Sequence, residues 1–98
     1  MDYNYKQKLF VDVVSAIGVI RAKYDRKVLK DLVLEPLVRI GTGEQIGFAV
    51  KILLYSRYSY NDEMVTDWKR LLKADDWFFS LKQNQLSVTF KVRYKNGG

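Results

Sequence analysis

The most constraining feature of this sequence is a strict alternation of apolar and polar side chains near the C-terminus. If residues 86–94 are extended, one side carries only apolar residues: Leu86, Val88, Phe90, Val92 and Tyr94. The other side carries Ser87, Thr89, Lys91 and Arg93. An earlier run alternates in the same way through Trp77, Phe79 and Leu81, and polar residues 82–85 separate the two runs. The pattern predicts a β-hairpin with one buried face.

Two further segments have the spacing of amphipathic helices. In residues 6–24 the repeating apolar positions are Phe10, Val13, Ile17, Ile20 and Tyr24. In residues 61–74 the buried face is Met64, Trp68, Leu71 and Leu72, and the basic outer face is Lys69, Arg70 and Lys73. Asn61 is a favourable N-cap, and the acidic pair Asp62-Glu63 suits the first turn of a helix. The sequence therefore predicts a helix in each segment.

The first of these helices is apolar over more than one face. Val11, Val14 and Val19 widen its apolar stripe beyond the positions that one core needs. A helix of this kind is buried on two sides, either inside the core or between subunits. We therefore expect a homo-oligomer with these three valines near the seam.

The middle of the chain is more ambiguous. After Asp25, residues 26–34 have Val28, Leu29, Leu32 and Val33 at helical spacing, and Pro36 is expected to end that helix before a short extended piece at 37–40. Thr42 and Gln45 have the spacing of a capping box, which favours a third helix along Ile46, Ala49, Val50 and Leu53, with Lys51 outside this face. The alternative is a strand through Ile46, Phe48, Val50 and Ile52. We expect the helix because of the capping box.

Several chemistries are unsupported by the sequence. It contains no histidine and no cysteine, which removes most protein sites for zinc, copper and haem and any nucleophile paired with histidine. The acidic pairs Asp62-Glu63 and Asp75-Asp76 suit a helix start and a helix end, and Gly41, Gly43 and Gly47 lack the spacing of a dinucleotide-binding loop. We expect no enzyme, metal, cofactor or small-molecule substrate.

The charge distribution favours an anionic partner. Lys and Arg number 17 against 11 Asp and Glu, a net charge of +6, and no acid follows Asp76. Nucleic acid is the first candidate. No apolar run is long enough to cross a membrane, and the N-terminus lacks a secretion signal, so we expect a cytoplasmic protein without membrane contact.

The expected order from residue 26 is helix, short strand, helix, turn, helix, strand, strand. This order resembles the winged helix-turn-helix family over about 70 residues, by topology and without a sequence signature. The fold class implied is α+β, a winged helix-turn-helix with an extra N-terminal helix and a C-terminal β-hairpin wing, in a single domain of residues 1–98. In that family the helix at 61–74 would be the recognition helix and the turn at 82–85 the wing tip. Acids at Asp62, Glu63 and Asp67 depart from the usual docking of that helix and shift the expected contact towards the wing.

The resemblance implies a small accessory or architectural protein, of a plasmid, a phage or another mobile element or with a transcriptional role, that binds double-stranded DNA through the wing and that helix. The expected DNA contacts are Arg57, Asn61, Lys69, Arg70, Lys73, Lys82, Gln83, Asn84, Gln85, Lys91 and Arg93. The competing hypothesis is a protein–protein interaction module that binds no nucleic acid. A more distant third is an RNA-cleaving toxin that uses only Lys, Arg, Tyr and acidic residues.

Overall fold

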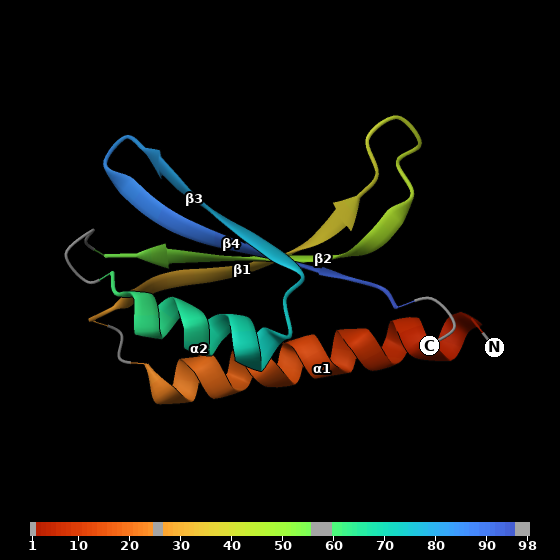
Figure 1. The fold of residues 1–98 in the computed structure, drawn as a ribbon, viewed down its shortest axis with the longest axis horizontal. Helices are drawn as coiled ribbons and strands as arrows, with labels where there is room; N and C mark the ends of the chain where they lie inside the picture. Colours follow the sequence, from red (N-terminus) through yellow and green to blue (C-terminus); the bar gives the residue numbers. More distant parts are fainter. Residues whose placement is uncertain (1, 25–26, 56–59, 96–98) are drawn as a thin grey trace.

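The chain folds as a layer of two helices packed on one face of an antiparallel sheet (Figure 1). The computed structural model describes residues 2–24, 27–55 and 60–95, with residues 2–4 described by their backbone alone. Within these ranges the elements are α1 (Asp2–Lys23), β1 (Leu29–Val38), β2 (Gln45–Leu54), α2 (Asp62–Leu72), β3 (Asp76–Lys82) and β4 (Gln85–Arg93). The strand order in the sheet is β1-β2-β4-β3.

The winged-helix prediction is wrong. A winged helix needs three core helices, whereas the described chain forms two helices and four strands. The α+β class remains, but the second and third expected helices are replaced by strands. Both are strands of the first hairpin, β1 paired with β2, which supplies half of the sheet.

Residues 26–34 were predicted as a helix, but Leu29–Val38 forms strand β1. The spacing of Leu32 and Val33 is compatible with a helix or a strand, and the pairing with β2 makes this segment a strand. Leu32 lies opposite Ile52 and Leu34 lies opposite Val50, so both leucines face the core. Pro36 does not end the element as expected, because β1 is an edge strand, where a missing N–H is tolerated.

The third helix, predicted from the capping box, is also wrong, because Gln45–Leu54 forms strand β2. This is the alternative strand through Ile46, Phe48, Val50 and Ile52. Thr42 accepts a hydrogen bond from the Glu44 N–H at 3.2 Å, so its hydroxyl caps a hairpin turn and not a helix. The helix-facing side of β2 is Phe48, Val50, Ile52 and Leu54, all buried. Gly47 is required in this strand because a Cβ there would lie 2.0 Å from the Val92 carbonyl oxygen on β4.

The remaining elements were predicted at nearly the observed positions. Helix α1 covers all but the last residue of the expected 6–24 and begins earlier, at Asp2. The Asn61 side chain caps α2 by accepting from the Met64 N–H at 2.9 Å. The C-terminal hairpin turns through Gln83 and Asn84, whose φ values of 52° and 64° are those of a two-residue type I′ turn.

The core lies between the sheet and the two helices. Trp68 of α2 is fully buried, with its ring edge-on to Tyr24 at 5.3 Å between centroids and to Phe90 at 6.4 Å. From α1 the buried residues are Val13, Ala16 and Ile20. The opposite face of the sheet carries no helix, and both hairpin turns curve towards that side (Figure 1). We call it the open face.

Candidate nucleic-acid interface

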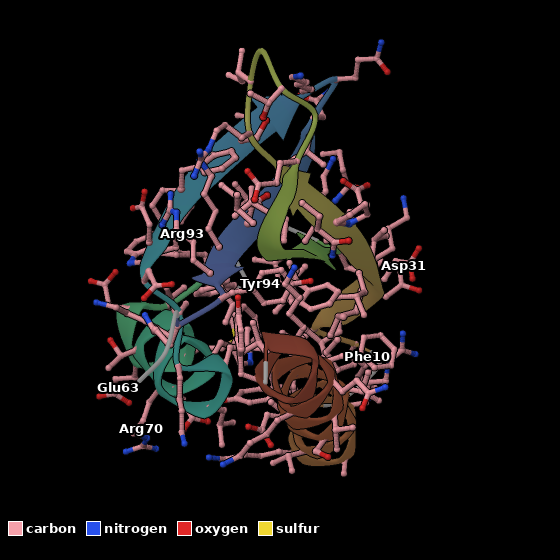
Figure 2. All side chains as sticks on the ribbon, turned by 90° about the vertical axis from the view of Figure 1, so that its right-hand side faces the viewer. Phe10, Asp31, Glu63, Arg70, Arg93 and Tyr94 are labelled. Carbon is pink, nitrogen blue, oxygen red and sulfur yellow. The ribbon has the colours of Figure 1, made fainter. Side chains whose placement is uncertain are left out.

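The open face of the sheet carries three basic side chains on its two central strands. They are Lys51 on β2 and Lys91 and Arg93 on β4. Strand alternation places them here because Val50, Phe90 and Val92, the residues beside them in sequence, point to the helices. Figure 2 shows the result for one pair, in which Arg93 points away from the helices and Tyr94 lies above α1.

On the β2 side, small residues lie opposite the two β4 cations: Arg93 lies across from Gly47, and Lys91 lies across from Ala49. On the β3 side, Lys91 lies across from Asp76. Lys51 lies across from Thr89, whose hydroxyl is an additional hydrogen-bonding group on this face. The three cations therefore form a short track along the middle of the open face.

Acidic side chains also lie on this face, but two of them bond to their own strand. Asp31 Oδ1 accepts from the Leu32 N–H at 2.8 Å, and Asp76 Oδ1 accepts from the Trp77 N–H at 2.9 Å. Glu35 is the third, on the edge strand β1. In the described chain no carboxylate lies within 4 Å of the charged groups of Lys51, Lys91 or Arg93. None of the three cations of the track is therefore held in an ion pair within the described chain.

Lys91 has an aromatic neighbour on the same face. Its Nζ lies 5.3 Å from the centre of the Phe78 ring on β3, a distance at which a cation interacts favourably with a ring face. Phe78 is 45% exposed. The ring thus holds the lysine without neutralising its charge.

Asp75 fixes the end of β4 next to this track. Its carboxylate accepts from the Arg93 backbone N–H at 2.8 Å and pairs with Lys95. Burial alone would raise the pKa of Asp75, but the hydrogen bonds from Lys95 and Arg93 outweigh it and hold the pKa below its usual value. Asp75 therefore anchors the backbone of Arg93, and the positive charge of the Arg93 side chain also helps to lower the pKa of Asp75.

A cleft adjoins the track where α1 begins and where β1 and β4 end. It has a volume of about 330 Å³ and is lined by Tyr5, Lys6, Arg39, Glu44, Gln45, Ile46, Arg93 and Tyr94. Lys6 Nζ lies 5.4 Å from the centre of the Tyr94 ring. The positive charge of Arg39 is partly neutralised by Glu44, with 3.8 Å between their charged atoms. Arg93 belongs both to this cleft and to the open face, so the positive charge continues from one to the other.

Helix α2 uses some of its predicted DNA contacts for structure. Asn61 is the N-cap described above. Arg70 pairs with Asp67 at 2.5 Å, and Asp67 also accepts from Lys23 at 2.7 Å and from Tyr24 at 2.6 Å. The Lys23 hydrogen bond, followed by the one from Tyr24, lowers the pKa of Asp67 to about 2. Asp67 therefore joins α2 to the end of α1.

The remaining basic residues of α2, Lys69 and Lys73, are exposed. They belong to the helical layer, and Figure 2 shows α2 below the sheet with Glu63 and Arg70 pointing outwards. The assignment of α2 as a recognition helix was tied to the winged-helix fold and falls with it. Whether Lys69 and Lys73 contact DNA stays a prediction.

The hairpin predicted at the C-terminus is formed by β3 and β4, but it is half of a four-stranded sheet and not the wing of a winged helix. Lys82, Gln83 and Asn84 are exposed at its turn. Gln85 is a structural residue, because its Nε2 donates to the carbonyl oxygens of Leu54 at 2.7 Å and Leu86 at 3.0 Å. Arg57 lies outside the described residues.

Comparison of the chain with protein-family models, curated proteins and solved structures finds no match. The site is therefore interpreted from its own geometry. Among the described residues, no group of three or more Asp and Glu side chains is arranged to hold a metal ion. No helix in these ranges has both the length and the apolar character needed to cross a membrane.

Sequence reasoning missed Lys51, Lys6 and Arg39 as candidate contacts. Lys51 was placed on the outside of a helix, although the alternation of Phe48, Val50 and Ile52 around it was the available signal for an exposed strand position. Lys6 and Arg39 carry no local signal. Lys6 lies on α1 and Arg39 directly after β1, and only the tertiary fold brings them to the cleft that Arg93 lines.

Proposed function

We propose that this chain binds double-stranded DNA by its phosphate backbone, through the open face of the sheet. The observation that carries the proposal is the track of Lys51, Lys91 and Arg93, on adjacent central strands and without carboxylate partners in the described chain. Lysine and arginine side chains in such a row can each replace a counterion on a phosphate. The net charge of +6 favours the approach of a polyanion.

The composition of the open face favours a duplex over a single strand. Proteins that hold single strands stack successive bases on several aromatic side chains. Among the strand residues of this face, Phe78 is the one aromatic, and Lys91 already lies over its ring. Duplex DNA carries about one negative charge per 1.7 Å of its axis, so a row of cations gains most from the duplex.

The cleft extends the surface beyond the sheet. With Arg93 at the junction, Arg39 and Lys6 supply two more cations that line the cleft. Contacts of this kind position a protein on DNA but carry no base information. The role that fits is an accessory or architectural one.

Alanine variants test the contact surface. Lys51→Ala, Lys91→Ala and Arg93→Ala are compared with Lys69→Ala and Lys73→Ala by gel retardation of a random-sequence duplex. We expect weaker binding for the three open-face variants and unchanged binding for the two α2 variants. The reverse ranking would place DNA on the helical layer and refute the proposed surface.

A protein-interaction module without nucleic-acid binding is the second candidate. The observation that favours it is an exposed apolar surface on α1, where Phe10, Val11, Val14 and Val19 are 44–58% exposed. A module of this kind would leave duplex DNA unretarded at moderate salt. The gel series above therefore separates the two functions.

A further inference from the structure

The two edges of the sheet differ in how well they are protected against pairing. Strand β1 carries Glu35 and Pro36 on its edge, and both a charge and a proline discourage the addition of another strand. Strand β3 has no such protection, because residues 77–81 contain neither a charge nor a proline. Edge strands of this second kind are templates for pairing with another chain.

The backbone groups that point outwards from β3 follow from its turn. A two-residue hairpin closes on a hydrogen-bonded pair, here Lys82 with Gln85, and such pairs recur at every second residue. The N–H and C=O groups of Trp77, Phe79 and Leu81 therefore point away from β4. The Trp77 N–H is in fact capped by its neighbour Asp76, at 2.9 Å, and not by β4.

The side chains along this edge are apolar and incompletely covered. Phe79 is 45% exposed and Leu81 57% exposed, although both are on the helix-facing side of the sheet. Within the described chain, Phe79 packs edge-on against Tyr60 and Trp77, with ring centroids 4.9 and 5.0 Å away. One side of this aromatic cluster thus remains open at the sheet edge.

We infer that β3 pairs with β3 of a second copy of this chain, antiparallel and about a twofold axis at Phe79. This register places Asp76 opposite Lys82 of the other copy at both ends of the paired strands. It also brings Trp77 beside Leu81 of the other copy and the two Phe79 side chains together. The strand is therefore complementary to itself in charge and in apolar surface. Its outward hydrogen-bonding groups also match once the Trp77 N–H exchanges the Asp76 carboxylate for the Leu81 carbonyl of the other copy.

The charges select this register from the alternatives. An axis at Phe78 or Ser80 would shift the pairing by two residues, leaving Asp76 opposite an uncharged residue and part of the seven-residue strand unpaired. The axis at Phe79 pairs the whole strand and joins its one acid to its one base. The dimer has one continuous eight-stranded sheet, with the two open faces on the same side.

The seam on β3 is distinct from the one expected on α1. The valines of α1 are exposed, but they lie on the helical layer and take no part in the pairing of β3. The inference also does not rest on the proposed DNA binding, because none of Lys51, Lys91 and Arg93 takes part in the pairing. The two proposals therefore succeed or fail separately.

Cysteine cross-linking tests the register directly, because the chain contains no cysteine of its own. Paired residues on the axis have Cα atoms about 5.5 Å apart, within the range that a disulfide spans. We expect Phe79→Cys to form a disulfide-linked dimer under mild oxidation. Ile40→Cys, at a position 99% exposed and outside β3, is the matched control and should form no disulfide-linked dimer. Cross-linking of Val14→Cys in place of Phe79→Cys would move the seam to α1 and overturn the inference.

Charge exchange provides an independent measurement by sedimentation equilibrium without nucleic acid. Asp76→Lys and Lys82→Asp each create two like-charge pairs, so each should weaken dimerisation about tenfold. The double variant restores opposite charges and should recover the parent dissociation constant. A parent that stays monomeric at high concentration, or a double variant no tighter than the single ones, would overturn the inference.

Discussion

The Tyr24 hydroxyl donates a 2.6 Å hydrogen bond to the Asp67 carboxylate, which joins the end of α1 to the middle of α2. The contact spans 43 residues of sequence. Burial, with the hydrogen bond to Asp67 next in size, raises the pKa of Tyr24 to about 12. The network fixes the helical layer that supports the sheet from below.

Acid should weaken the fold through Asp67. Its pKa in the folded chain is about 2, against 3.8 for an ordinary aspartate, so the ionised carboxylate favours the folded state. This contribution is complete above the ordinary pKa and is lost as the pH falls from about 4 to about 2. Urea unfolding at several pH values should show that decline. Asp67→Asn should be less stable at neutral pH and should show a flatter decline. An unchanged pH profile would contradict the assigned role.

Gly47 and Gly18 should respond oppositely to alanine. At Gly47 the added Cβ would meet the Val92 carbonyl oxygen at 2.0 Å, in a backbone that cannot move without opening β2 from β4. We expect Gly47→Ala to cost at least about 3 kcal/mol of unfolding free energy. At Gly18, in the middle of α1, no atom lies within 4 Å of the added Cβ. Gly18→Ala should therefore raise the free energy of unfolding by about 0.5–1 kcal/mol, because alanine is the better helix former. Thermal unfolding of both variants measures the difference, and equal effects would contradict the observed close approach.

Asn61 should matter for stability and not for DNA. Its side chain accepts the Met64 N–H and is the N-cap of α2. Asn61→Ala should lower the unfolding free energy by about 1 kcal/mol, and Asn61→Asp should retain most of the cap. DNA affinity measured on the folded variants should equal that of the parent. A drop in affinity with both substitutions would restore Asn61 as a contact residue.

Strand β4 and helix α2 could be predicted from the sequence, because the periodicity of their apolar residues matches the face that each packs on the core. The strict alternation from Leu86 to Tyr94 predicted β4, and Asn61 with the spacing of Met64 and Trp68 predicted α2. Both elements keep one face on the core, so a periodic pattern is enough to define them.

The first hairpin was unpredictable for a different reason. Val28, Leu29, Leu32 and Val33 fit a helical spacing, and Thr42 with Gln45 fits a capping box. Neither pattern contains the pairing of β1 with β2 or of β2 with β4, which decides the structure. Lys51 was therefore assigned to a helix, and only part of the candidate surface was predicted. Lys91 and Arg93 were predicted from the alternation of β4. Lys51 and the cleft could be identified only from the structure of the whole sheet.

The salt dependence of DNA binding tests the central claim most directly. Fluorescence anisotropy of a labelled random duplex gives the affinity at several salt concentrations, for the parent and for a variant with Lys51, Lys91 and Arg93 all changed to alanine. Each lost phosphate contact should reduce the slope of log affinity against log salt by about 0.9, so the triple variant should lose between two and three units of slope. A triple variant with the parent's affinity and slope would contradict the account, and the open face would then have no part in binding DNA.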